Sequence, residues 1–172
     1  YFEPSPSVTL AQNTTYAEFG YAITTCDFDG DTNLDLAIAS RSFEDRDVDE
    51  IAANQGAVFL YLGTGSGLSV QPNQIIYGKE LNGAQWEYSP QLKLGKSLAA
   101  GHLNDDAFCD LVVGAYAPLV SNGDDGAVLI YSGKAGTDLT MGGVEDSPAL
   151  AYRRITSQTK SQVGRSIAVA NI

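Results

Sequence analysis

Residues 27–35 read Asp-Phe-Asp-Gly-Asp-Thr-Asn-Leu-Asp, and this acidic stretch decides how the rest of the chain is interpreted. Its carboxylates stand at alternate or near-alternate positions, so a folded loop would bring like charges together unless a cation neutralised them. The stretch offers only oxygen ligands, which favours a hard divalent ion, and flexible coordination by many oxygens favours calcium over magnesium. Gly30 permits a tight turn. We therefore predict a Ca²⁺ loop here; the alternative is a solvated acidic turn.

The acidic stretch does not fit an EF-hand, whose loop requires Gly at its sixth position and a bidentate Glu at its twelfth. Counting from Asp27, those positions hold Thr32 and Ile38. Residues 34–40 follow the two-residue period of a strand, and no helical stripe flanks the loop. The sequence therefore predicts a calcium loop that joins two strands.

The composition is that of an acidic globular chain. Its 172 residues are 44% hydrophobic and carry a formal net charge of −11, without a dense basic run. This charge repels phosphate backbones and anionic membrane surfaces, and no stretch has the apolar length of a membrane span, so we expect neither nucleic-acid binding nor membrane insertion. Because weak calcium modules suit millimolar calcium, we expect an extracellular, cell-surface or periplasmic location. Asn13 begins a glycosylation triplet that is compatible with secretion.

Cys26 and Cys109 form an even pair, which an oxidising compartment would allow to bridge. Two cysteines are too few to indicate a disulfide framework. Cys109 stands at an apolar position that is equivalent to Leu34 in the first loop. The favoured interpretation is therefore two small buried side chains, and bridging is left open.

Several segments of the chain repeat one another. Residues 19–23 recur at 94–98 and again at 163–167, with spacings of 75 and 69 residues between the shared glycines, and residues 56–63 recur at 126–133. Turn residues divide each unit into four short strands, which we place at 19–26, 34–40, 56–62 and 73–77 in the first unit and at 94–102, 110–116, 126–132 and 151–156 in the second. Four-stranded units in series predict an all-β fold, specifically a β-propeller fragment.

The order of these motifs resembles the FG-GAP repeats of integrin α-subunit propellers and of bacterial FG-GAP surface proteins. From about Ser7 onward, a hydrophobic-Gly pair, the acidic nonapeptide, a buried strand and a Gly-Ala-Val-x-x-Tyr strand follow in the family's order. The resemblance implies the end of a preceding blade at 1–17, blades at 18–93 and 94–162, and the first strand of a third blade at 163–172. It also implies that the remaining blades of the ring come from the same parent chain or from other chains.

By this resemblance, the first loop holds Ca²⁺ through the side chains of Asp27, Asp29, Asp31 and Asp35 and the backbone carbonyl of Asn33. In the second loop a histidine replaces the leading carboxylate and a neutral asparagine follows, so the aligned donor set is weaker: His102, Asn104, Asp106, Phe108 and Asp110. Weak calcium binding there and a hydrogen-bonded turn without metal are both left open. The second loop lacks the soft ligands of a zinc site.

Ligands of the family that the chain resembles bind on the face opposite the calcium loops. Loops expected at 41–55, 81–91 and 116–125 form that candidate ligand face, and they combine carboxylates with aromatic rings: Glu44, Asp45, Asp47, Asp49, Trp86, Tyr88 and Tyr116. Such residues suit a basic protein surface or a carbohydrate, although a charged run is also typical of a solvated loop.

We therefore predict a calcium-stabilised extracellular adhesion or protein-interaction module. One alternative is a noncatalytic propeller domain attached to a secreted enzyme, such as a phospholipase or a polysaccharide-degrading protein. Another is an architectural component of a surface fibre or complex.

The sequence carries no catalytic constellation, so we expect no enzyme activity in this chain. It has one His, and no Ser or Cys has a recognisable base and orienting acid around it. Residues 63–67 are rich in glycine but lack the Lys that follows in a phosphate-binding loop, and we interpret them as a hairpin turn between the third and fourth strands.

Overall fold

The computed structural model describes residues 9–10, 18–44, 54–82, 85–88, 92–115, 126–135, 154–156 and 163–170. All of the regular elements in these residues are β-strands, and the strands pair antiparallel, so the predicted all-β class is confirmed. The described residues include no helix with the length and hydropathy needed to cross a lipid bilayer.

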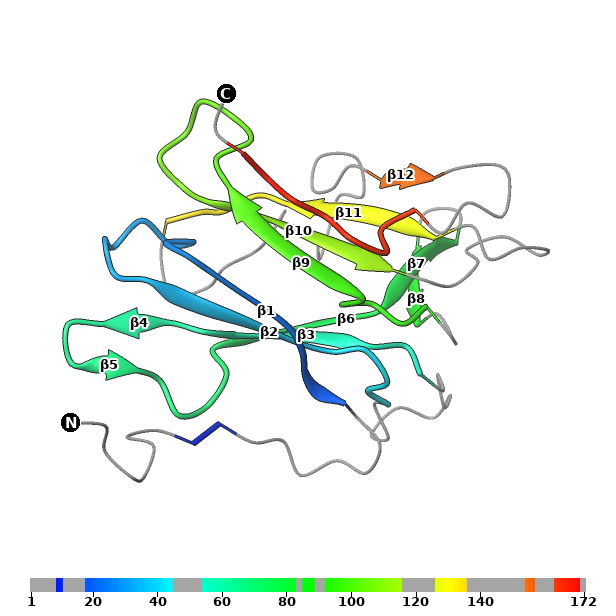
Figure 1. The fold of residues 1–172 in the computed structure, drawn as a ribbon, viewed down its shortest axis with the longest axis horizontal. Coiled ribbons are helices and arrows are strands. Elements are labelled where there is room, and N and C mark those ends of the chain that lie inside the picture. The colour runs from blue at the N-terminus through cyan, green and yellow to red at the C-terminus, as the bar shows by residue number, and fades with distance from the viewer. Residues whose placement is uncertain are drawn as a thin grey trace.

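Two four-stranded sheets form the body of the described structure (Figure 1). In the first sheet the strands lie in chain order: β1 (Phe19–Cys26), β2 (Asp35–Ser40), β3 (Ala57–Tyr61) and β6 (Gln74–Tyr77). The second sheet repeats this order with β9 (Ser97–Gly101), β10 (Asp110–Ala115), β11 (Ala127–Tyr131) and β12 (Arg154–Thr156). These strands lie within the ranges predicted from the sequence, because turn residues in the sequence separate short apolar runs.

Two small hairpins accompany the sheets. The first pairs β4 (Gly63–Thr64) with β5 (Gly67–Leu68), which confirms the hairpin predicted at 63–67. The second pairs β7 (Lys79–Asn82) with β8 (Gln85–Tyr88), so the prediction of a plain loop at 81–91 was wrong for residues 81–82 and 85–88. β8 alternates polar and aromatic residues over Gln85–Tyr88, so it carries a short strand signal that was not used, whereas β7 shows no such alternation.

The central strands β2 and β3 of the first sheet are buried on both faces. On one face Ala37 and Ala39 of β2 belong to a core cluster shared with the second sheet. On the other face Ile38 packs in a second cluster with Phe43 and Phe59, whose rings meet edge-on with centroids 5.4 Å apart, and Leu10 covers part of this cluster. Burial on both faces is expected of a sheet that is stacked in a series, and it explains why β2 and β3 are almost continuously apolar.

The contact between successive units occurs twice. Gly56 forms a parallel bridge with Leu94, and Gly126, which is 70 residues later, forms a parallel bridge with Val163. The segment 163–170 also runs beside β9, as the red trace in Figure 1 shows. The third unit therefore meets the second at the same point of the repeat as the second meets the first.

Repeat glycines make this close approach possible. Gly95 has φ +89°, and a Cβ added there would lie 2.6 Å from the Cβ of Ala39 in the preceding sheet. Gly164 has φ +80°, and its Cβ would overlap the carbonyl oxygen of Ala127. Both positions combine a left-handed backbone with a tight contact, so only glycine fits them without strain.

Candidate metal site

The acidic stretch 27–35 forms the turn between β1 and β2, and its backbone wraps around one carboxylate. Asp27 accepts hydrogen bonds from the backbone N–H groups of Gly30 at 2.7 Å, Asp31 at 3.1 Å and Thr32 at 2.8 Å. Gly30 has φ +78°, which confirms that this position uses the freedom of glycine, and Thr32 has φ +73°. The turn is therefore held by its own first side chain, as in other turns that aspartate initiates.

Three carboxylates of the loop converge. Ligand oxygens of Asp27, Asp29 and Asp35 all lie within 4.8 Å of one another. A calcium ion binds oxygen at about 2.3–2.6 Å, so two of its ligand oxygens can be up to about 5 Å apart. The spacing therefore fits one shared calcium ion, and the donors are the hard oxygens that such an ion prefers.

The pKa values of three aspartates in the loop are shifted, and not all in the same direction. Burial raises the pKa of Asp29, and the nearby charges of Asp31 and Asp27 raise it further. Burial also raises the pKa of Asp35. The pKa of Asp31 is instead lowered, because the side chain and backbone of Asn33 donate hydrogen bonds to it at 3.0 and 2.7 Å. Asp31 thus accepts a hydrogen bond from Asn33 on each of its oxygens, and it does not belong to the close group of three.

Asp35 has a second, structural role. Its side chain is fully buried, and its two oxygens accept hydrogen bonds from the backbone N–H groups of Phe28 and Gly63, each at 2.8 Å. These bonds tie the start of the acidic loop to the start of β4, two residues after the end of β3. Asp35 therefore fixes the loop on the sheet through protein hydrogen bonds alone.

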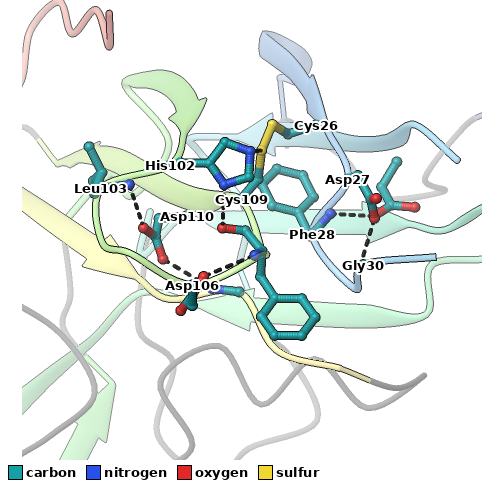
Figure 2. Close-up of a disulfide and its surroundings, with 12 residues drawn as sticks. Cys26, Asp27, Phe28, Gly30, His102, Leu103, Asp106, Cys109 and Asp110 are labelled. Atoms are coloured by element: carbon teal, nitrogen blue, oxygen red, sulfur yellow. Dashed lines mark hydrogen bonds between the residues drawn. A yellow bond between two sulfur atoms is a disulfide. The ribbon is translucent and has the colours of Figure 1, made fainter. Parts of the chain in front are cut away.

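The second loop keeps this structural carboxylate without the cluster. Asp110 is buried, and its two oxygens accept hydrogen bonds from the backbone N–H groups of Leu103 at 2.8 Å and Gly133 at 3.2 Å, as Figure 2 shows in part. Asn104 and Asp106 each accept a hydrogen bond from a backbone N–H group two residues later, at 2.9 Å. Within the described residues, the only group of three metal-ligating side chains is the one in the first loop.

A disulfide joins Cys26 at the end of β1 to Cys109 just before β10 (Figure 2). The favoured interpretation of two separate buried thiols was therefore wrong, although Cys109 is indeed buried. The two residues are 83 positions apart in the chain, and only the packing of one sheet on the other brings their Cα atoms within 6.0 Å. No local pattern in the sequence reports that proximity.

The candidate ligand face is described only in part. Glu44 follows the end of β2, whereas the acidic loop precedes the start of β2, so the two lie at opposite ends of that strand. Trp86 and Tyr88 lie on β8. The other candidates lie outside the described residues: Asp45, Asp47, Asp49 and Tyr116, together with the glycosylation candidate Asn13.

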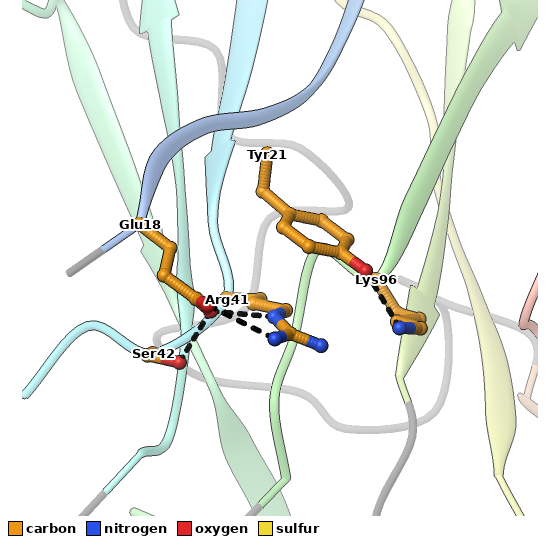
Figure 3. Close-up of polar contacts among 5 residues, drawn as sticks. All are labelled: Glu18, Tyr21, Arg41, Ser42 and Lys96. Atoms are coloured by element: carbon orange, nitrogen blue, oxygen red, sulfur yellow. Dashed lines mark hydrogen bonds and ion pairs between the residues drawn. The ribbon is translucent and has the colours of Figure 1, made fainter. Parts of the chain in front are cut away.

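A polar cluster that the sequence analysis missed links the two units (Figure 3). The Arg41 guanidinium lies 4.2 Å from the ring centroid of Tyr21, and the Nζ of Lys96 donates a hydrogen bond to the Tyr21 hydroxyl at 2.7 Å. This hydrogen bond lowers the pKa of Tyr21. Tyr21 and Lys96 each follow the repeat glycine of their unit, and this shared position is the one sequence feature that relates the two residues.

Glu18 closes the same cluster. It accepts two hydrogen bonds from the Arg41 guanidinium, at 2.5 and 2.9 Å, and one from the hydroxyl of Ser42 at 2.6 Å (Figure 3). The hydrogen bonds from Arg41, followed by the one from Ser42, lower the pKa of Glu18 to about 2. The carboxylate therefore stays ionised in the folded chain at pH values that would protonate it in the unfolded chain.

The Glu18→Gln substitution is expected to have a pH-dependent effect on stability. Since the folded pKa lies below the ordinary value, the ionised carboxylate stabilises the fold fully above pH 4.5 and progressively less as pH falls toward 2. The side chain is 41% exposed, so solvent screening limits the loss at neutral pH to about 0.5–1 kcal/mol. Urea unfolding from pH 7 to 2.5 with a chelator present measures it.

The exposed Asp105→Asn substitution on the second loop controls for the loss of one negative charge. A difference between Glu18→Gln and the parent chain that stays constant down to pH 2.5 would contradict the assignment.

Comparison with known proteins gives partial matches. No family model matches the chain. The chain is 33% identical over 132 residues to integrin alpha-5 of Xenopus laevis, a match that covers 76% of this chain and 11% of that protein. It is 31% identical over 134 residues to mouse integrin alpha-8, covering 75% of this chain and 12% of the relative. It is also 30% identical over 132 residues to mouse phosphatidylinositol-glycan-specific phospholipase D, covering 75% of this chain and 15% of that protein.

The chain therefore spans only between 11% and 15% of the length of these relatives. About three quarters of it is similar in sequence to a segment of integrin alpha subunits.

Proposed function

We propose that the chain is a section of a calcium-stabilised β-propeller with FG-GAP repeats, which acts outside the cell in adhesion or protein interaction. The observation that carries this proposal is the convergence of Asp27, Asp29 and Asp35 in a loop between two strands. Similarity to integrin alpha-5 and alpha-8 over about three quarters of the chain supports the extracellular role.

Calcium would have a structural role in this module. Asp27, Asp29 and Asp35 would hold the ion, and the side chain of Asp31 and the carbonyl of Asn33 belong to the proposed donor set. When bound, the ion supplies positive charge that offsets the repulsion among the carboxylates and fixes the long turn, so that metal binding and folding are coupled. The second loop is proposed to be held by hydrogen bonds, with weak calcium affinity at most.

The repeated junction between units supports the propeller. Both four-stranded sheets have the same strand order, and parallel bridges at Gly56 and Gly126 join each unit to the next. A ring of blades requires such a junction to recur in the same direction, with a rotation that closes the ring. In this arrangement the proposed units are 1–17, 18–93, 94–162 and 163–172, and the remaining blades come from the same parent chain or from other chains.

The proposed partner surface lies at the ends of the strands opposite the acidic loop. It includes Glu44, Trp86 and Tyr88, together with Asp45, Asp47, Asp49 and Tyr116. Carboxylates and aromatic rings on one face suit a basic patch on an extracellular protein, or a carbohydrate that stacks on the rings. The proposed activity is binding and not catalysis.

Calorimetric titration with CaCl₂ tests the metal site. The full chain is expected to bind one ion per chain, and Asp27→Asn is expected to weaken binding at least tenfold, because it removes a charged ligand from the centre of the turn. The matched control is Asp106→Asn, which alters the equivalent turn of the second loop and should leave the affinity within about twofold of the parent. Two tight sites in the parent chain would show that the second loop had been misjudged.

A solid-phase binding assay tests the proposed adhesive role. The full chain is expected to bind at least one extracellular matrix protein in calcium. Reversing the charges of Asp45 and Asp47 to Lys is expected to reduce that binding several-fold without changing the melting temperature. Reversing the exposed Asp105 in the second loop, at the other end of the strands, serves as the control. Equal binding by the two variants would remove the loop 41–55 from the partner surface.

A second candidate function is a noncatalytic propeller domain attached to a secreted enzyme. It is favoured by the match to mouse phosphatidylinositol-glycan-specific phospholipase D, which covers as much of this chain as the match to integrin alpha-8. Such a domain would use the same calcium loop and would position a substrate for its neighbour. Detection of hydrolase activity in the parent protein, together with no matrix binding, would favour this candidate over adhesion.

A further inference from the structure

We propose that the Cys26–Cys109 disulfide is a redox switch for the first acidic loop, such that its reduction by a dithiol lowers the calcium affinity of Asp27, Asp29 and Asp35. This inference rests on the calcium function proposed above. It adds a regulatory link between the redox state of the surroundings and the metal site.

The disulfide is attached directly to the acidic loop. Cys26 immediately precedes Asp27, and its partner Cys109 also donates a backbone hydrogen bond to the Asp27 carbonyl oxygen at 3.1 Å. Two links, one covalent and one hydrogen-bonded, therefore join the start of the first loop to the second unit. Figure 2 shows the disulfide between the two loops, with Asp27 and Phe28 on one side and His102 on the other.

Further contacts hold the same loop against the second unit. The backbone N–H of Lys134 donates a hydrogen bond to the Phe28 carbonyl oxygen at 3.2 Å. The Phe108 ring packs so closely on Gly30 that a Cβ at Gly30 would overlap it. Residues 108–109 and 133–134 thus form a support for the loop, and the disulfide is the covalent part of that support.

The covalent link matters to the metal because the loop gathers like charges. The three carboxylates attract a cation only while the turn holds them within a few ångströms, and their repulsion favours an opened turn when no ion is present. A cross-link to the second unit restricts that opening and so lowers the entropy that calcium binding must remove. Breaking the link allows the turn to open, and affinity falls.

The different burial of the two cysteines sets the direction of attack. Cys109 is 2% exposed, whereas Cys26 is only partly buried, so the thiolate of a dithiol reaches the sulfur of Cys26. A bond forms between that sulfur and the reductant while the Cys26–Cys109 bond breaks, and the electron pair leaves with the Cys109 sulfur, which takes up a proton. The second thiol of the reductant then attacks the reductant's other sulfur, which is bonded to Cys26 in the mixed disulfide, and Cys26 is released as a thiol. Two electrons have passed to the protein, and the reductant leaves as an intramolecular disulfide.

His102 lies beside the buried sulfur. Its Nε2 is 3.7 Å from the Cys109 Sγ, and its Nδ1 lies 3.0 Å from the carbonyl oxygen of Phe108. Since a carbonyl oxygen only accepts hydrogen bonds, Nδ1 is assigned as the protonated nitrogen, and Nε2 is left to accept a hydrogen bond from the Cys109 thiol after reduction. His102 therefore offers the buried Cys109 thiol a hydrogen-bond partner in the reduced chain. This contact stabilises the reduced form, in which the acidic loop can open.

Calcium titration of the full chain in its oxidised and dithiothreitol-reduced forms tests the switch. We expect reduction to weaken calcium binding about tenfold while the far-UV circular dichroism spectrum is retained. By linkage, saturating calcium should make the reduction potential of the disulfide more negative by about 30 mV, the equivalent of tenfold for a two-electron couple. The potential is measured on the unsubstituted chain in redox buffers with calcium or with chelator.

Two variants complete the design. The pair Cys26→Ser with Cys109→Ser should bind calcium like the reduced chain and should not respond to dithiothreitol, which controls for effects of the reagent itself. The pair Cys26→Ala with Cys109→Val fills the buried position with an apolar side chain and replaces the serine pair if the latter does not fold.

The outcomes separate this inference from the one on which it rests. No calcium binding by the oxidised chain would overturn both the calcium site and the switch. Equal calcium affinity in the oxidised and reduced chains, with no calcium effect on the potential, would overturn the switch alone. Loss of the circular dichroism spectrum on reduction would also overturn it, because the disulfide would then hold the whole fold and not the loop.

Discussion

Removal of calcium with a chelator is expected to lower the free energy of unfolding of the full chain by about 1.4–2.7 kcal/mol relative to 10 mM calcium. The range follows from the dissociation constants of roughly 10⁻⁴–10⁻³ M that extracellular calcium modules show, because a ligand that binds only the folded state stabilises it by RT times the logarithm of one plus the ratio of ligand concentration to dissociation constant. For a domain of this size the melting temperature should fall by roughly 3–10 °C. Differential scanning calorimetry with and without the chelator measures this change.

The Asp29→Ala variant should reproduce most of that loss in the presence of calcium. Asp29 is the best residue to remove, because its carboxylate accepts one weak backbone hydrogen bond, from Asp31 at 3.1 Å, whereas Asp27 and Asp35 each hold more of the loop. With the chelator present, Asp29→Ala should melt at or slightly above the parent chain, since it relieves charge repulsion in the loop.

Asp106→Ala in the second loop is the matched control for Asp29→Ala. Asp106, like Asp29, accepts a hydrogen bond from the backbone N–H group two residues later. The Asp106→Ala variant should melt with the same calcium dependence as the parent chain. Equal melting of the parent chain with calcium and with chelator would count against a calcium-stabilised loop.

The Gly95→Ala substitution is expected to destabilise the chain by about 2–5 kcal/mol. It places a side chain at φ +89°, which costs roughly 1–2 kcal/mol, and the added Cβ lies 2.6 Å from the Cβ of Ala39, which adds an overpacking penalty of about 1–3 kcal/mol. Urea denaturation in saturating calcium measures the change while the metal loop is kept constant.

Gly20→Ala is the matched control, because Gly20 occupies the same place in the first unit as Gly95 in the second. Its φ is +87°, but a Cβ there would meet nothing within 4 Å, so only the backbone penalty of about 1–2 kcal/mol applies. The difference between the two variants measures the packing of one unit on the next. Equal losses would mean that the junction at Ala39 yields without cost and does not fix the approach of the two sheets.

The all-β class and the strand positions were predictable because each depends on short-range patterns. The strands β2 and β3 are apolar runs between turn residues, and the repeat of residues 56–63 at 126–133 gave the second sheet its counterpart strand. The convergence of the acidic side chains was also predictable in outline, since Asp27, Asp29 and Asp35 belong to one short loop. The hydrogen bonds from Asn33 to Asp31 could not be predicted, because they depend on the backbone conformation of the turn.

The links between units could not be derived in the same way. The disulfide joins residues 83 positions apart, and the contact between Tyr21 and Lys96 joins residues 75 apart. Both depend on how one sheet is placed on the next, which is a property of tertiary packing and leaves no periodic signal in the chain. The repeat itself held partial information, because Tyr21 and Lys96 are equivalent residues of neighbouring units.

The buried carboxylates of Asp35 and Asp110 have a consequence for how such units change over time. Each fastens its turn to the sheet through two backbone hydrogen bonds, and the second unit does so without the three converging carboxylates of the first. The architecture of the turn is therefore separable from its capacity to hold an ion. During evolution one repeat can therefore gain or lose a cation site through a few substitutions of surface side chains. The hydrogen bonds that hold the turn on the sheet need not change.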